Sequence, residues 1–141
     1  QRSRRSSARQ QAELTMEVLG FHHLAIGVRD LAKVGAFYRE VLGLAELKRH
    51  SRETGQLRSI WFSLPGGGFV ALEQKEDAAP GNSFLVLSLR ISAADRLRVI
   101  SELERRCIPV THQTQWTVYF KDPEGNPLAL SHYPQDSPTP G

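Results

Sequence analysis

The sequence predicts an α+β protein in which two β-α-β-β-β modules form a curved mixed sheet around a ligand cleft. The main observation is a repeat, since one strand, one helix and three further strands are predicted twice in the same order. The two copies also align directly, with 23–28 lying over 86–91 at an offset of 63 residues. A chain of 141 residues that is 40% hydrophobic can bury a core, whereas each copy is too small to be stable alone.

The first copy begins with a strand and a helix. Apolar and polar residues alternate from 19 to 28, which is the period of a strand with one buried face. Asp30 is a suitable N-cap, apolar residues then recur at helical spacing as far as Leu42, and Gly43 is placed to end the helix. Three strands complete the copy, at 45–50, 57–64 and 69–74, and a Pro-Gly-Gly-Gly turn at 65–68 joins the last two.

The second copy repeats this order after a polar linker at 75–82. A strongly apolar strand is predicted at 84–91, and Ser92 is the N-cap of a helix that ends near Arg106. Three strands again follow, at 110–113, 115–121 and 127–131. The last two are separated by an Asp-Pro-Glu-Gly-Asn turn at 122–126, in which Pro, Gly and Asn each favour turn geometry.

These elements define one domain at 16–134, with the first repeat at about 18–76 and the second at about 83–133. Residues 1–15 are predicted to be a disordered basic arm or an addition to the natural chain, because they contain four arginines and lack the apolar segment of a signal peptide. Residues 135–141 are predicted to be a loose tail.

Charge and composition argue against several classes of partner. The net charge is +3, but without the four arginines of the arm it is −1, so the charge gives no reason to expect nucleic-acid binding. No apolar run approaches the roughly 20 residues of a membrane span, so we expect no membrane partner. Cys107 is the only cysteine, which excludes an internal disulfide and favours a reducing, cytoplasmic location.

Three motifs occur in order across the domain. They are His-His-Leu-Ala-Ile-Gly-Val-Arg-Asp-Leu at 22–31, Phe37-Tyr38 followed by Val-Leu-Gly at 41–43, and Tyr-Phe-Lys-Asp-Pro-Glu-Gly-Asn-Pro-Leu at 119–128. With these motifs, 19–134 resembles the vicinal oxygen chelate superfamily, which contains glyoxalase I, extradiol dioxygenases, and fosfomycin- and bleomycin-resistance proteins. The resemblance implies paired β-α-β-β-β modules, frequent homodimers and a small-molecule pocket inside the curved sheet.

The resemblance also implies a metal site with one ligand from each of four strands. His23 matches the first histidine, and Glu73 matches the carboxylate at the end of the first repeat. The other two ligand positions hold Val86 and Ala129, neither of which can coordinate a metal. One histidine and one carboxylate hold a divalent ion such as Fe, Ni, Zn or Mn weakly, so we expect either no metal or a weakly bound one.

The side chains near these positions have alternative roles. Alternation along a strand predicts that His22 faces away from His23, and that His132 faces away from Ala129. Glu73 is either a pocket acid or base that works without a metal, or a solvent-facing residue at the end of its strand.

Three aromatic residues in the predicted strands are candidates for ligand contact. Aromatic residues in strands usually belong to the core, and we expect this of Trp61, Trp116 and Tyr119. Any of the three that faces inward also lines the ligand pocket. The sequence does not name the ligand, because side chains from several strands together determine the shape of the pocket.

Two functions of different classes remain open, with a structural or regulatory domain as a third. The first is a protein that binds a small aromatic or cationic molecule in the sheet cleft, which the residues at 86 and 129 favour. The second is a divalent-metal-dependent lyase of the glyoxalase kind or an extradiol-type dioxygenase, which uses His23 and Glu73 with a further ligand not identified. In both cases we expect a cytoplasmic homodimer with a small-molecule ligand.

Overall fold

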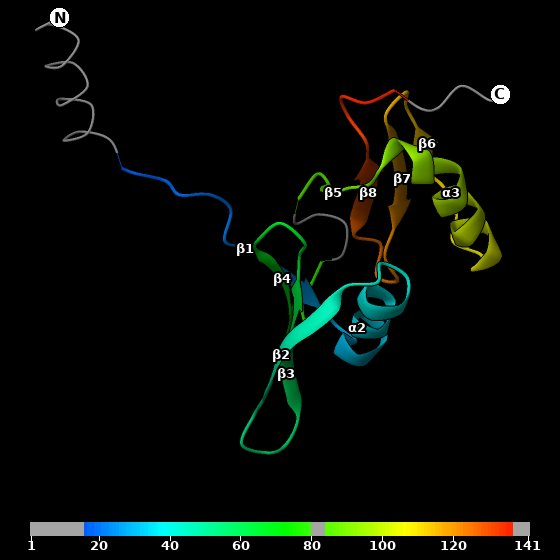
Figure 1. Cartoon of the computed structure of the whole chain (residues 1–141). Helices are drawn as coiled ribbons and strands as arrows, with labels where there is room; N and C mark the ends of the chain where they lie inside the picture. The colour runs from blue at the N-terminus through cyan, green and yellow to red at the C-terminus, as the bar shows by residue number, and fades with distance from the viewer. Residues whose placement is uncertain (1–15, 80–83, 137–141) are drawn as a thin grey trace, which may run out of the picture.

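The computed structural model describes residues 16–79 and 84–136 of the chain (Figure 1). The predicted arm at 1–15, residues 80–83 at the end of the predicted linker and most of the predicted tail at 135–141 lie outside the described residues. Within the described part of the chain, no helix has the length and apolar character needed to cross a membrane.

The first module is a four-stranded sheet with one helix. Its elements are β1 (His23–Val28), α2 (Leu31–Glu40), β2 (Ala45–Ser51), β3 (Leu57–Ser63) and β4 (Phe69–Gln74). The strands lie in the order β1-β4-β3-β2, with β1 parallel to β4 and the other pairs antiparallel. As predicted, the Asp30 side chain caps α2 by accepting a hydrogen bond from the Lys33 amide (3.1 Å), and Gly43 follows the helix with φ 66°.

The second module repeats this arrangement, which confirms the predicted α+β class and the duplicated order of elements. Its elements are β5 (Leu87–Arg90), η1 (Ala93–Asp95), α3 (Arg96–Arg105), β6 (His112–Gln113), β7 (Thr117–Lys121) and β8 (Pro127–Ser131). The strand order is β5-β8-β7-β6, with β5 parallel to β8. The predicted helix begins later than expected, because Ser92 caps the short 3-10 helix η1 through the Ala94 amide and α3 follows it.

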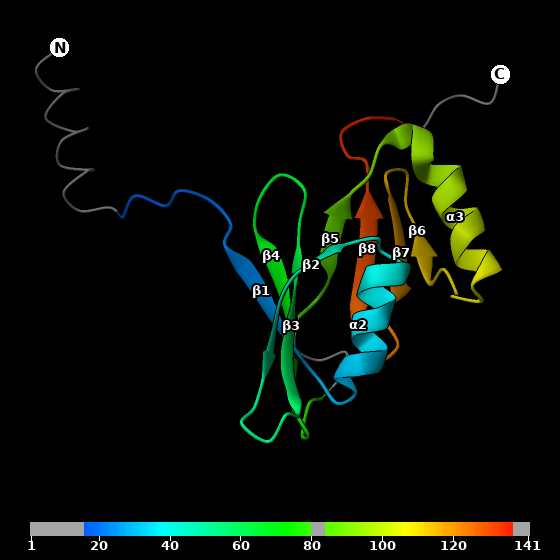
Figure 2. The same ribbon diagram turned by 60° about the horizontal axis from the view of Figure 1, so that its bottom comes forward.

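The two sheets are separate rather than joined into one curved sheet. No strand of the first sheet is hydrogen-bonded to a strand of the second within 16–79 and 84–136. Figure 2 shows the two sheets side by side, with α2 in front of β8 and α3 beside the second sheet. The modules are therefore connected through a shared core and not by backbone pairing across a sheet edge.

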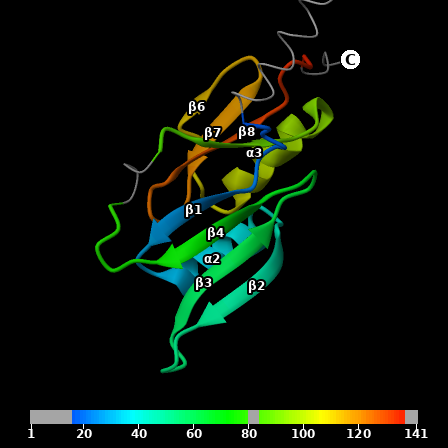
Figure 3. The ribbon, with the colours of Figure 1, turned by 90° about the vertical axis from the view of Figure 1, so that its left-hand side faces the viewer.

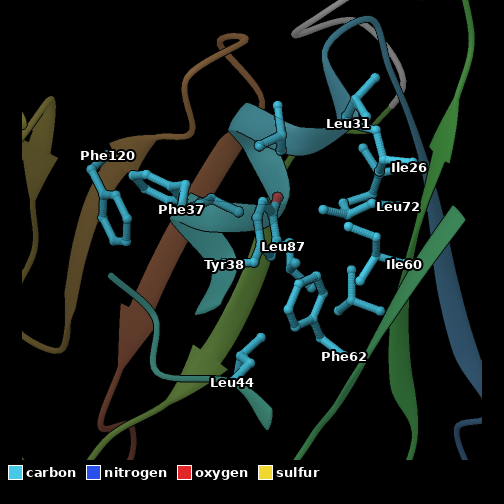
Figure 4. Close-up of a cluster of buried hydrophobic side chains, with 14 of the residues drawn as sticks. Ile26, Leu31, Phe37, Tyr38, Leu44, Ile60, Phe62, Leu72, Leu87 and Phe120 are labelled. Atoms are coloured by element: carbon cyan, nitrogen blue, oxygen red, sulfur yellow. The ribbon is translucent and has the colours of Figure 1, made fainter. Parts of the chain in front are cut away.

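Helix α2 supplies that shared core, because side chains of this one helix contact both sheets (Figure 4). Toward the first sheet, the ring centre of Tyr38 lies 6.1 Å from that of Phe62. Toward the second sheet, the ring centre of Phe37 lies 6.5 Å from that of Phe120 on β7. Further core residues from the two sheets are Ile26, Val28, Ile60, Val70, Leu72, Leu87, Val118 and Leu128. Burial of each side chain of this size contributes roughly 1.5–3 kcal/mol.

A buried polar contact joins the modules inside this core. The Tyr38 hydroxyl on α2 donates a hydrogen bond to Asp122 Oδ2 (3.0 Å), and both side chains are buried. The Asp122 carboxylate also accepts from the amides of Glu124 and Asn126 and from Asn126 Nδ2, so the turn at 122–126 is built around it. Burial and the neighbouring Asp122 carboxylate raise the pKa of Tyr38, which keeps this tyrosine neutral in the folded protein. We call these contacts the Asp122 latch.

The same turn also holds the N-terminus of α2. The Glu124 carboxylate accepts hydrogen bonds from the Arg29 amide (2.7 and 3.0 Å) and from the Asp30 amide (2.7 Å). A negative charge is favourable at this position, because the amides at a helix N-terminus lack partners within the helix and carry a partial positive charge. The turn between β7 and β8 is therefore attached to α2 at two separate points.

Helix α2 covers only one face of the first sheet. Along β3, Ile60 and Phe62 are buried toward α2, whereas the alternating residues Ser59, Trp61 and Ser63 point to the other side. Figure 3 shows this other side toward the viewer, with α2 behind β3 and β4. We call it the open face. By strand register it carries His23, Ala25 and Gly27 from β1, Phe69, Ala71 and Glu73 from β4, Ser59, Trp61 and Ser63 from β3, and Lys48 and His50 from β2.

The Asp122 latch predicts how stability depends on Tyr38 and on pH. Tyr38→Phe removes one donor from a buried carboxylate, so we expect the free energy of unfolding at pH 8 to fall by about 1–3 kcal/mol. Because the folded protein keeps Tyr38 neutral while the unfolded chain ionises it near pH 10, the stability that Tyr38 adds is present below about pH 10 and decreases above it. The wild type should therefore lose about 1 kcal/mol more than Tyr38→Phe between pH 10 and pH 11.

Urea denaturation of both proteins at several pH values measures this difference. Tyr133→Phe is the matched control, because Tyr133 is 65% exposed and lies outside the latch. A constant difference between wild type and Tyr38→Phe across this pH range would show that the buried hydroxyl is not linked to the latch as described.

Candidate functional site

His23 and Glu73 lie on the open face but do not meet. His23 is the Cα partner of Phe69, whereas Glu73 is the partner of Gly27, four residues further along β1. Four residues of parallel strand correspond to about 13 Å. The His23 ring stacks on Phe69 instead, with ring centres 4.7 Å apart and planes 7° from parallel. The structure therefore places both predicted ligands on one face without bringing them together, and their metal-ligand roles stay predictions.

The pairing registers also show which positions are equivalent in the two modules. Ala25 pairs with Ala71, and Ser88, which follows Ala25 by 63 residues, pairs with Ala129. The position equivalent to Ala129 is therefore Ala71, and Glu73 lies two residues beyond it on the same strand. The resemblance implied Glu73 and Ala129 as corresponding ligand positions, but strand pairing, which determines which residues are level, makes them non-equivalent.

His22 differs from its prediction. Its Nδ1 lies 2.7 Å from the Nδ1 of His23, so the two rings meet, and one of these nitrogens carries the shared proton. His22 precedes the first residue of β1, so the alternation of a regular strand does not apply to it. Within the residues that the structure describes, no group of three His, Cys, Asp or Glu side chains is arranged to hold a metal ion.

A continuous row of rings crosses the open face, with one ring from each strand. His23 on β1 stacks on Phe69 of β4, and Phe69 stacks on Trp61 of β3 with ring centres 4.5 Å apart and planes at 21°. The row ends at His50 of β2, whose ring centre lies 4.8 Å from that of Trp61. We call these four side chains the aromatic row. Only Trp61 was among the residues that the sequence predicted to line a pocket.

The geometry of the aromatic row determines what it presents to a ligand. The stacked rings are nearly parallel, and their centres are separated by about the distance between neighbouring strands, roughly 4.8 Å. Each ring therefore turns its face to its neighbour and its edge to the open side. Ring edges carry partial positive charge and ring faces partial negative charge, so an approaching molecule meets a row of positive edges.

Three polar atoms beside the aromatic row have no hydrogen-bond partner among the residues that the structure describes. They are Ser59 Oγ, Trp61 Nε1 and His50 Nε2, all of them buried. Ser59 is the Cα partner of both His50 and Glu73, and Trp61 lies two residues further along β3. The side chains of these four residues therefore occupy neighbouring positions on three strands. A buried polar group without a partner costs about 1–3 kcal/mol, which makes this part of the open face a place where a bound molecule or water is favoured.

The second sheet differs at the equivalent positions. Tyr119 pairs with Ala129 as Trp61 pairs with Ala71, but its only ring contact among the described residues is with His112, at 5.6 Å. Thr117 Oγ1 donates to Ser131 Oγ (2.9 Å), so the hydroxyl that corresponds to Ser59 has a partner here.

Trp116 lies apart from the other two predicted pocket residues. It precedes β7 and packs edge-on against Tyr133, with ring centres 5.0 Å apart. No ring contact in the described part of the chain joins Trp61, Trp116 and Tyr119. The structure therefore distributes these three residues over three different surroundings.

The fold, the three motifs and the register now support a family assignment. The sequence model of the Glyoxalase/Bleomycin resistance protein/Dioxygenase superfamily matches residues 20–130. The chain belongs to this superfamily. The predicted resemblance to the vicinal oxygen chelate proteins is confirmed by this match. Among curated protein sequences, none matches the chain.

Solved structures of similar fold include proteins with different activities. Lactoylglutathione lyase from Agrobacterium tumefaciens is 21% identical with a TM-score of 0.64, covering 84% of this chain and 96% of that one. TnmS3, an antibiotic binding protein from Streptomyces sp. CB03234, is 24% identical with a TM-score of 0.66, covering 84% and 98%. The fosfomycin resistance protein FosX from Listeria monocytogenes is 17% identical with a TM-score of 0.66, covering 82% and 93%. At these identities the likeness shows the fold alone.

Phe69 and His50 are the residues of the site that sequence reasoning missed. Phe69 alternates with the core residues Val70 and Leu72 along β4, which assigns it only to the face away from the helix, and β2 has no buried residue from which the face of His50 could be inferred. Their contact with Trp61 depends on the register between β2, β3 and β4, which the sequence of each strand does not reveal. An aromatic residue on the outward phase of each of several strands is the signal that could have found the row.

Proposed function

We propose that this superfamily member binds a planar aromatic small molecule on the open face of the first sheet, without a metal held by His23 and Glu73. The aromatic row is the observation that carries the proposal. Four rings on four strands form a half-buried aromatic surface, and three unpartnered polar atoms lie next to it. Surfaces that combine aromatic contact with a few polar groups are typical of small-molecule sites. TnmS3, which has a similar fold, is an antibiotic binding protein.

The residues at the four expected ligand positions support a binding role that needs no metal. Val86 and Ala129 stand where the family pattern has two ligands, and Glu73 is separated from His23 along the strands. Divalent Zn and Ni sites need three or four protein donors, and an Fe(II) site needs two histidines and a carboxylate. The residues present therefore do not fit such a centre, and no reaction step is assigned to one.

A metal-dependent lyase or dioxygenase is the second candidate function. It is favoured by one observation, that His23 and Glu73 both project from the open face. FosX, which has a similar fold, has been solved in complex with Mn(II). In this candidate a further ligand, from another residue or from a second copy of the chain, completes the site.

Metal content separates the two candidates. After dialysis against Fe(II), Ni(II), Zn(II) or Mn(II) and then against metal-free buffer, we expect well below one ion per chain by elemental analysis, because two separated donors bind an ion weakly. His23→Ala should leave this small content unchanged. One ion per chain in the wild type that is lost in His23→Ala would establish the metal-dependent candidate instead.

Ligand binding tests the proposed site directly with 2-naphthol, a neutral planar probe, by titration calorimetry. Phe69→Ala interrupts the aromatic row at its centre, so we expect binding to weaken about tenfold or more. The control is Leu97→Ala, since Leu97 is exposed on α3 and outside the row. If Trp116→Phe weakened binding and Phe69→Ala did not, the ligand would occupy the second module, and the open face would not be the site.

We also propose a cytoplasmic homodimer. The outer edges of β1 and β5 have no strand partner within the described residues, and exposed apolar side chains lie beside them. These are Leu19 (91% exposed) and Phe21 (58%) before β1, and Leu85 (91%) before β5. Unpaired edges flanked by apolar residues favour association with a second chain.

Light scattering at micromolar concentration tests the dimer. We expect a mass of twice the 15.8 kDa chain. Leu85→Glu should shift the protein toward the monomer, because it places a charge beside the edge of β5. Leu97→Glu changes an equally apolar exposed residue on α3 and should leave the dimer intact. A monomeric wild type would contradict the proposal.

A further inference from the structure

We propose, on the basis of the function proposed above, that the open face selects planar aromatic molecules that carry a carboxylate or another anionic oxygen. The aromatic ring lies on the edges of the aromatic row, and the anionic oxygen lies at Lys48 and Trp61 Nε1. Four observations lead to this chemistry, namely the orientation of the rings, the donor without a partner, the lysines at the margins and the position of Glu73.

The rings set the preference for an electron-rich partner. Because His23, Phe69 and Trp61 turn their edges to the open side, a molecule lying on them places its face against positive ring edges. This is the edge-to-face arrangement, which is favourable for a ring with a negative face. A cation would instead need an exposed ring face, and the faces of Phe69 are occupied by its two neighbours.

The indole nitrogen of Trp61 favours an acceptor. It is only a donor, and its buried N–H has no acceptor among the described residues. The N–H is covered in the free chain, and the His50 ring packs on Trp61 with ring centres 4.8 Å apart, so a ligand reaches it when the His50 ring moves aside and the stacked rings stay in place. Satisfying this donor then offsets the cost of moving the ring.

The charged side chains define which end of the ligand is anionic. Lys48 is the Cα partner of Trp61, so its side chain leaves β2 level with the row. At the far end of the sheet, the Lys75 side chain fills the space beside Gly27, with its Cδ 3.1 Å from the position that a Cβ on Gly27 would take. Among the described residues of the open face, Glu73 is the acidic side chain, and it is level with Ser59 and Gly27, at the same end as Lys75. Lys48 is level with Trp61 and Ala71 and has no acidic side chain beside it on this face, so the anionic oxygen is expected near Lys48.

A matched series of probes tests the selection by titration calorimetry. The probes are 2-naphthoate, 2-naphthol and 2-naphthylmethylammonium, which share a ring system and differ in charge. We expect 2-naphthoate to bind about tenfold more tightly than 2-naphthol, and the ammonium to bind more weakly than both. Tighter binding of the ammonium, or equal binding of all three, would overturn the charge selection but leave the proposed function standing. No binding of any probe would overturn the proposed function itself.

Two variants locate the anionic oxygen. Lys48→Gln should remove most of the advantage of 2-naphthoate over 2-naphthol, because the neutral probe does not use this charge. Trp61→Phe keeps a ring in the row but removes the N–H, and it should weaken 2-naphthoate several-fold more than it weakens 2-methylnaphthalene, which has no acceptor. Lys33→Gln, at an exposed position on the other side of the sheet, on α2, is the matched charge control and should change neither affinity. An unchanged preference in Lys48→Gln would show that the oxygen is not held at this position.

Discussion

The Asp122 carboxylate is the contact on which the arrangement of the two modules depends. It is buried and accepts four hydrogen bonds, from Tyr38, from the amides of Glu124 and Asn126, and from Asn126 Nδ2. A buried charge is tolerated only when its donors are all in place. Three of them belong to its own turn and one belongs to α2 of the other module, so the same carboxylate stabilises both the turn and the docking of the modules. Since α2 packs on one face of the first sheet, the opposite face of that sheet stays open.

Much of this fold could be predicted from the sequence, because its signals are local. Hydrophobic periodicity, the Asp30 and Ser92 caps and the duplicated order of elements predict nearly every helix and strand. The turn at 122–126 was also recognised, but only as a turn. Its second role, holding both the hydroxyl of Tyr38 and the N-terminus of α2, depends on contacts between residues more than 80 positions apart, which one sequence does not reveal.

The candidate site was harder to predict because it depends on strand register. Each strand of the first sheet contributes one ring to the aromatic row, and no two of these rings are close in sequence. The same dependence explains the placement of Glu73. The family resemblance pairs Glu73 with Ala129 as ligand positions, whereas the pairing of the strands makes Ala71 the residue equivalent to Ala129. A shift of two residues keeps a side chain on the same face but moves it by about 7 Å, which is enough to separate it from a shared ligand.

The surroundings of His23 suggest why a histidine stands at a ligand position of a module that lacks the other donors. A metal ligand must direct a ring lone pair at the ion, and its other nitrogen is normally held by a fixed partner. The His23 ring instead lies flat against Phe69, and its Nδ1 is engaged by His22. In this position a histidine extends the aromatic row to the edge of the sheet and remains polar where the row meets water. Val86 and Ala129 lie in the second module and add no donor for an ion that His23 could share, so the stacking contact with Phe69 is the interaction of this ring that the structure shows.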